Sequence, residues 1–275
     1  MLVFPFFVSA GPLAEATLWL AVWCYVCRHN YILHNHVHCP FTTSKKLNRL
    51  LNMMLGFCTG MTAGNWKITH IHGHHVEHRV ENLPSRNSMR YLKIEQNRPY
   101  SVLSGIQHSL RTAPLQWLLP LYVMITGTLK GSSARAKYYR FYLVEFLLVY
   151  GTVGLFVWMN PTKAAIYFGS IYSLVYLISR YVDYLTHASS HGSSNLSIAN
   201  VCLNTSYNRA FWNFGYHVAH HVRPGAHWTC LPSIYESLNV AEDPTPVGKR
   251  PNTLGAFTPT TFSWHRVLGE RETAK

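Results

Sequence analysis

Two long apolar segments separated by a tight turn constrain the fold of this chain more than any other feature. Residues 141–159 and 164–182 each hold a single charged residue, and about 20 mostly apolar residues suffice to cross the roughly 30 Å hydrocarbon core of a bilayer. Asn160-Pro161 between them is typical of a turn, so the two segments are predicted to form a membrane-spanning helical hairpin. Arg180 lies near the end of the second segment, where its side chain is expected to extend toward the membrane surface.

A third segment, residues 12–33, is also predicted to span the membrane, because its only charged residues, Glu15 and Arg28, lie toward its ends. Residues 47–66 and 114–129 are apolar but interrupted by Gly or Pro. They are predicted to be interfacial or re-entrant, and neither is expected to make a single full crossing. A buried helical core in a soluble protein is the alternative, but only 13% of the residues are charged, about half of the usual share in soluble domains.

The charge balance is strongly basic, with 24 Lys and Arg against 11 Asp and Glu and a net charge of +13. The basic residues lie mostly between the predicted spans, which by the positive-inside tendency places those regions in the cytoplasm. Such a surface suits anionic lipid headgroups or an acidic partner protein. Nucleic acid is not an expected partner, because no nucleic-acid-binding motif is present and the basic residues form no dense run.

The histidines, 17 in all, are concentrated in three short clusters that flank the apolar segments. Within each cluster histidines recur at i and i+3 or i+4, so on a helix they share one face, and each pair can close on one metal ion. Nearby carboxylates are too scarce for a ferritin-like site, and imidazole suits Zn, Cu, Fe and Ni alike. The clusters consist of His34, His36 and His38; of His70, His72, His74, His75 and His78; and of His217, His220 and His221.

Together these clusters resemble the three histidine boxes of the membrane-bound fatty acid desaturase and hydroxylase family. The boxes here read His34…His38, His70…His74-His75 and His217…His220-His221. The resemblance covers about residues 12–240. Asp183-Tyr-Leu-Thr-His187 is similar to an additional box of the alkane monooxygenases, with Asp183 in place of their Asn and Thr186 in place of their Glu.

The resemblance implies an all-α fold in which multi-pass transmembrane helices carry a cytosolic helical cap with a histidine-rich site for two metal ions. Residues 1–240 would form this domain, and residues 241–275, rich in Pro and Thr, are expected to form a loosely ordered tail. The resemblance also implies a non-haem diiron centre that activates O2 and oxidises an unactivated C–H bond of a fatty acyl chain. The implied iron ligands are His34, His38, His70, His74, His75, His187, His217, His220 and His221.

Residues around the boxes are candidates for supporting roles. The candidates for outer partners that orient the iron ligands are Asp183, His36, His72 and His78. The candidates for the wall of a substrate pocket are Trp66, Tyr216 and Trp228. The chemistry also needs external electrons, and the six cysteines form no iron–sulfur pattern. A separate electron-donor protein of the ferredoxin, rubredoxin or cytochrome b5 type is therefore expected.

Three interpretations of the activity stay open, with fatty acid desaturation as the leading one. Hydroxylation of a fatty acid or an alkane is the alternative, because the same oxidising chemistry serves both reactions and the sequence does not separate them. A histidine-rich membrane metal transporter is a more remote alternative. It predicts ionisable ligands within the spans, whereas the histidine clusters of this chain lie just beyond the ends of the apolar segments.

Overall fold

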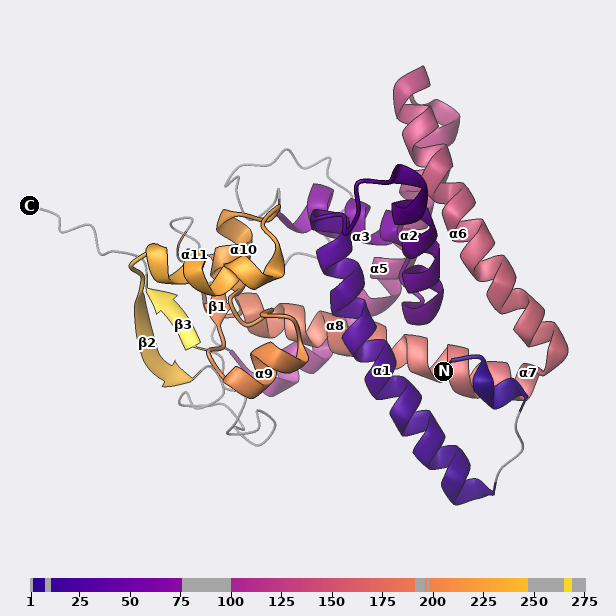
Figure 1. Cartoon of the computed structure of the whole chain (residues 1–275), viewed down its shortest axis with the longest axis horizontal. Coiled ribbons are helices and arrows are strands. Elements are labelled where there is room, and N and C mark those ends of the chain that lie inside the picture. Colours follow the sequence, from indigo (N-terminus) through magenta and orange to yellow (C-terminus); the bar gives the residue numbers. More distant parts are fainter. Residues whose placement is uncertain are drawn as a thin grey trace, which may run out of the picture. The chain divides into compact units, whose positions relative to one another are not determined.

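A computed structural model of the chain is mostly helical, as predicted (Figure 1). The chain divides into two compact units. Unit 1 comprises Met1–His72 and Ala113–Leu177, and unit 2 comprises Gly73–Thr112 and Ile178–Lys275. The residues that the structure describes are 2–7, 11–75, 100–190, 196, 198–246 and 265–268.

The elements follow one another along the chain as Figure 1 labels them, with η marking 3-10 and π segments. The helical elements are η1 (Phe4–Phe6), α1 (Pro12–His38), α2 (Lys45–Thr59), α3 (Ala63–Trp66), η2 (Lys67–His74), α5 (Val102–Lys130), α6 (Ser133–Met159), α7 (Pro161–Ala164), η4 (Ala165–Ser170), α8 (Ile171–His187), α9 (Thr205–Ala210), α10 (His217–Val222), η5 (Trp228–Cys230) and α11 (Leu231–Ser237). The strands are β1 (Asn200–Val201), β2 (Ala241–Pro246) and β3 (His265–Leu268).

Among the described residues, two helices are long and apolar enough to cross a membrane. They are α6 and the continuous helix Pro161–His187, which contains α7, η4 and α8. Only 22% of the most apolar stretch of α6 is buried inside the structure, whereas a helix in a soluble core would be mostly buried. The chain reverses between α6 and α7, where the Asn160 side chain accepts from the Lys163 amide and Pro161 begins the next helix (Figure 1).

The third predicted span, residues 12–33, forms most of α1 but is not one of these two helices. α1 has 27 residues, so length is not the reason. Its Trp and Tyr side chains and the polar run at residues 28–30 lower its mean hydropathy, and a crossing by α1 stays a prediction.

The two interrupted apolar segments, residues 47–66 and 114–129, overlap α2 and α5. α2 has 15 residues and is about 22 Å long, which is shorter than the hydrocarbon core. α5 contains Pro114 and Pro120.

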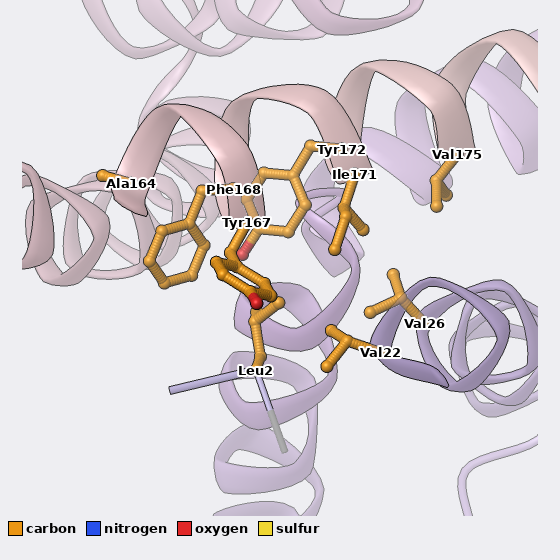
Figure 2. Packing of buried hydrophobic residues seen from close by; sticks show 9 residues of the cluster. All are labelled: Leu2, Val22, Val26, Ala164, Tyr167, Phe168, Ile171, Tyr172 and Val175. Carbon is orange, nitrogen blue, oxygen red and sulfur yellow. The ribbon is translucent and has the colours of Figure 1, made fainter. Parts of the chain in front are cut away.

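An apolar cluster of unit 1 fastens α1 to the first part of the second candidate span (Figure 2). Val22 and Val26 of α1 face Ile171 and Val175 of α8 across this contact. All four side chains are buried, and close van der Waals packing of this kind is what holds helices together within a bilayer. The contact therefore holds the axis of α1, and with it the histidines at the end of that helix.

A left-handed glycine turns the chain from α2 toward the helix that carries the second histidine box. Gly60 has a φ of 70° and its amide donates to the Gly56 carbonyl at 2.8 Å. The Gly60 carbonyl accepts from the hydroxyls of Tyr150 and Tyr176 at 2.5 and 2.8 Å. A Cβ at this position would lie 2.4 Å from the Tyr172 ring, so both the backbone and the space require glycine.

Unit 2 contains an antiparallel sheet of three strands in the order β1-β3-β2. The all-α prediction did not include this sheet, two strands of which lie within residues 241–275. β1 has only two residues and β2 includes two prolines, so no alternating apolar pattern marks them. The side-chain amide of Asn200 in β1 donates to the carbonyls of Leu185 and Ala188 at 2.8 and 2.9 Å, which fastens β1 to the end of α8.

Candidate metal centre

Three predicted ligands of unit 1 converge at the end of α1. His34 and His38 occupy its last two turns, and His70 lies in η2. The Nε2 atoms of His34 and His70 are 2.8 Å apart, and one ligand nitrogen from each of the three residues lies within 4.8 Å of the others. Trp66 covers this group, with its ring centroid 5.0 Å from that of His34 and 5.2 Å from that of His70.

Four predicted ligands of unit 2 converge more closely, from η2, α8 and α10. Their Nε2 atoms form a closed ring in which neighbours are 3.0 to 3.2 Å apart. In order around the ring the residues are His74, His187, His217 and His221. The last three are at most 1% exposed, so the centre of the ring is shielded from bulk water.

A histidine pair lies beside this ring within unit 2. The Nε2 atoms of His75 and His220 are 3.0 Å apart, and both side chains are buried. The His75 ring centroid is 4.6 Å from that of His221. Each of the nine histidines predicted as ligands therefore lies in one of three groups of closely spaced imidazoles.

The spacing within the ring of four histidines fits a metal ion. Nitrogens about 2.0–2.1 Å from one ion, at tetrahedral or octahedral angles, are separated by roughly 2.9–3.4 Å, and the observed neighbours lie within that range. His187 gives an independent indication, because its Nδ1 is 2.8 Å from the Ile198 carbonyl. A carbonyl only accepts, so Nδ1 carries the hydrogen and Nε2 directs a lone pair into the ring.

The second histidine box differs from its prediction in the partners of its two outer members. His70 and His74 both lie on η2, a π-helix, but the His70 ring lies against His34 of α1, whereas the His74 ring lies against His187 of α8 and His221 of α10. His70 belongs to the group of unit 1, and His74 belongs to the ring of unit 2. The prediction that this pair closes on one ion is wrong, whereas the i and i+4 pairs of the first and third boxes stay together.

Burial lowers the pKa of ligand histidines that lie outside the candidate spans. The pKa values of His34 and His221 are held well below the ordinary value, first by desolvation and then by neighbouring histidines. Burial, followed by the positive charge of Lys67, lowers the pKa of His38 to about 4. These imidazoles are neutral at neutral pH, which is the form that binds a metal.

Asp183, a predicted outer partner, links the ring of four histidines to a buried arginine. Its Oδ1 lies 3.5 Å from His74 Nδ1 and its Oδ2 lies 2.7 Å from Arg180 Nη1. A carboxylate beside the outer nitrogen of an imidazole fixes the ring orientation and strengthens the inner nitrogen as a ligand. Arg180 is only 5% exposed, so the expectation that it extends to the membrane surface is wrong.

The other predicted outer partners have different surroundings. His36 Nε2 is 3.3 Å from the Asn48 carbonyl, so this side chain fastens the end of α1 to α2. His72 Nε2 is 2.9 Å from the hydroxyl of Tyr138 in α6. Both side chains thus connect helices of unit 1, and their role as outer partners of the iron ligands stays a prediction. His78 lies outside the described residues.

The three predicted pocket residues differ in their contacts. Trp66 contacts ligand histidines, whereas Tyr216 and Trp228 pack on other aromatic rings. The ring centroid of Tyr216 is 5.6 Å from that of Tyr235, and that of Trp228 is 5.2 Å from that of Trp212. Both contacts lie within unit 2.

Sequence reasoning missed two polar side chains of α5 that bind Arg180. His108 Nε2 is 3.0 Å from Arg180 Nη2, and Arg180 Nε donates to Thr112 Oγ1 at 3.0 Å. The available signal was their spacing, because residues 108 and 112 are four apart and share a helix face. Because Arg180 is expected at the membrane surface, the sequence gives no reason to pair it with these two residues.

The chain matches the fatty acid desaturase family over residues 10–246. That stretch includes the three histidine groups and Asp183. No curated protein and no solved structure matches the chain.

Proposed function

Because the chain belongs to the fatty acid desaturase family, we propose that it is an integral membrane oxidoreductase that uses O2 to oxidise an unactivated C–H bond of a fatty acyl chain, with desaturation as its reaction. Family membership confirms the resemblance drawn from the histidine boxes. The observation that carries the proposal is the ring of four buried Nε2 atoms, spaced 3.0 to 3.2 Å apart. Such a ring holds a metal ion with neutral nitrogen ligands.

The proposed cofactor is a pair of iron ions, one for the histidines of unit 1 and one for the ring of unit 2. When bound, they supply the oxidising power, drawn from O2 and two electrons, that an unactivated C–H bond requires. The residues of the chain keep the imidazoles neutral, fix their orientation and exclude water. The Ile198 carbonyl sets the tautomer of His187, and burial of the rings protects a reactive centre from solvent.

We also propose a membrane setting and two partners. The exposed apolar surface of α6 supports contact with lipid, from which an acyl substrate would enter, and the basic loops support a cytoplasmic active site. All six cysteines are free thiols. The electrons are therefore assigned to a separate donor of the ferredoxin, rubredoxin or cytochrome b5 type, for which the net charge of +13 offers a complementary surface.

The test is a product assay on the full chain, purified in detergent and reconstituted with Fe²⁺, a reductant system and defined fatty acyl substrates. Mass spectrometry of the extracted lipids distinguishes the outcomes: desaturation removes two hydrogens from the substrate, whereas hydroxylation adds one oxygen. Desaturated product supports the proposal. Hydroxylated product would mean that the reaction is hydroxylation and not desaturation. Unchanged substrate together with an iron-free protein overturns the proposal.

A matched pair of variants links the product to the histidine ring. His217→Ala removes a ring member, whereas His227→Ala removes an exposed histidine of the same region, which bonds to Thr229. The proposal requires that only the first variant loses iron and product.

A further inference from the structure

We propose that Arg180 and His108 are positioning residues for the ring of four histidines, and that they act by holding Asp183 against the outer nitrogen of His74. This inference rests on the proposed function, because it assumes that the ring binds a metal ion. All four residues belong to unit 2, and they come from three different helical elements.

Arg180 is fixed by acceptors on two helices. Its Nη1 is 2.7 Å from Asp183 Oδ2, its Nη2 is 3.0 Å from His108 Nε2, and its Nε donates to Thr112 Oγ1 at 3.0 Å. The guanidinium is planar and rigid, and one ion pair and two hydrogen bonds fix its orientation. The position of the Asp183 carboxylate is consequently set by α5 as well as by α8.

His108 has to be a neutral acceptor in this arrangement. A guanidinium has only donors, so His108 Nε2 receives the hydrogen bond and the histidine carries its own hydrogen on Nδ1. Burial, and then the positive charges of Arg180 and Arg111, lower the pKa of His108 to about 3. The imidazole therefore keeps its acceptor at physiological pH, which explains how a histidine can lie against an arginine.

The two oxygens of Asp183 have separate tasks. Arg180 binds Oδ2, and this leaves Oδ1 at 3.5 Å from His74 Nδ1. The carboxylate attracts the Nδ1 hydrogen of His74, so the Nε2 lone pair points into the ring. Without Arg180 the carboxylate would be a poorly solvated charge lacking a cation, and rotation toward water would withdraw it from His74.

The same contacts also tie α5 to α8, so a purely structural tether has to be distinguished from positioning. A tether predicts lower resistance to unfolding with unchanged metal affinity. Positioning predicts weaker metal binding, with altered ligand geometry, in a protein that is still folded.

The experiment is a titration of the metal-free full chain in detergent with Co²⁺, whose absorption bands report ligand number and geometry. Arg180→Gln and His108→Leu remove the two proposed residues. His108→Gln restores an acceptor oxygen, and Arg135→Gln removes an exposed arginine of α6 as a matched control. Thermal melting of each variant reports whether it is folded.

Positioning predicts that Arg180→Gln and His108→Leu bind Co²⁺ about tenfold or more weakly at one site, with shifted bands, and that His108→Gln and Arg135→Gln resemble the original protein. Unchanged affinity and bands in folded Arg180→Gln would overturn the inference. If that variant does not fold, His108→Leu decides in the same way, because it leaves the Arg180–Asp183 ion pair in place. An original protein that binds no Co²⁺ overturns the proposed function itself.

Discussion

The two units hold their histidines by different means. In unit 1 His34 and His38 lie at the end of α1, and the helix that begins at Ala63 and carries His70 is anchored through its backbone: the amide of Ala63 donates to Glu145 Oε1 at 2.9 Å. In unit 2 the third box lies on α10, which has only six residues, and charged side chains orient the ring through Asp183. The positions of the histidines therefore depend on helix ends in unit 1 and on a buried ion pair in unit 2.

Glu145 and Arg180 show the same contrast, since each is the only charged residue of a predicted span. Both are buried, at 3% and 5% exposure. Charged residues inside spans are costly and usually have a function. Here the Glu145 carboxylate accepts a hydrogen bond from a backbone amide of the helix that carries His70. Arg180 forms an ion pair with Asp183, the side chain that orients His74.

The largest expected effect comes from breaking the ring of unit 2 itself. His187→Ala should remove the metal of unit 2 and leave that of unit 1, so the iron content should fall to about half, with loss of turnover to background, because three remaining imidazoles bind far more weakly. Elemental analysis of purified protein and the product assay measure both quantities. Loss of all iron would break the comparison, since it would mean that the two groups do not bind independently.

A smaller effect is expected from the anchor in unit 1. Glu145→Leu deprives the buried Ala63 amide of its acceptor and should lower the free energy of unfolding by about 1–3 kcal/mol. Unfolding by denaturant in micelles measures this change, and Co²⁺ titration should show weaker binding to the histidines of unit 1 only. Glu145→Gln keeps an acceptor oxygen and should recover most of the loss. If it is as unstable as Glu145→Leu, the charge of Glu145 matters rather than its hydrogen bond.

The network of unit 2 should show in the difference between the pH dependence of stability of the original protein and that of His108→Gln. The pKa of His108 is lowered from 6.5 to about 3 in the folded protein, so between these values the unfolded chain binds the extra proton. The free energy of unfolding should therefore fall as pH drops below 6.5, with a contribution approaching about 1.4 kcal/mol per pH unit. Unfolding of the metal-free protein at several pH values measures the slope, and His108→Gln should reduce it. An equal slope in both proteins would exclude His108 as its source.

Much of this arrangement follows from sequence spacing. Apolar run length predicted both helices of the hairpin, and histidine spacing predicted the pairs on α1 and α10, because both depend on local helical geometry. The split between His70 and His74 did not follow, since spacing along one helix does not reveal which neighbouring elements each side chain will contact. The sheet also escaped prediction, because β1 has only two residues and β2 contains two prolines.

The burial of Arg180 escaped prediction for a different reason. Its partner His108 is 72 residues away in the sequence, and a single sequence carries no signal that joins two such distant positions. Asp183 was predicted from its similarity to a known box, and the structure places it beside His74. That Arg180 is its charged partner could be seen only in the tertiary structure.

The smallest expected effect tests the claim that helix ends govern unit 1. Thr62 begins α3, and its hydroxyl oxygen accepts from the Asn65 amide at 3.3 Å. Thr62→Ala should cost about 1 kcal/mol of unfolding free energy. Ser132 begins α6 without a side-chain cap, so Ser132→Ala, its matched control, should be neutral.

Both variants are measured by denaturant unfolding and by Co²⁺ titration of the two groups. Because α3 continues directly into η2, fraying at Thr62 should loosen His70, and Thr62→Ala should weaken Co²⁺ binding in unit 1 while the bands of the ring of unit 2 stay unchanged. If instead Thr62→Ala shifts the bands of the ring of unit 2, the start of the helix controls His74 as well as His70. The proposed difference between the units, with helix ends fixing the histidines of unit 1 and an ion pair orienting the ring of unit 2, would then fail for the second histidine box.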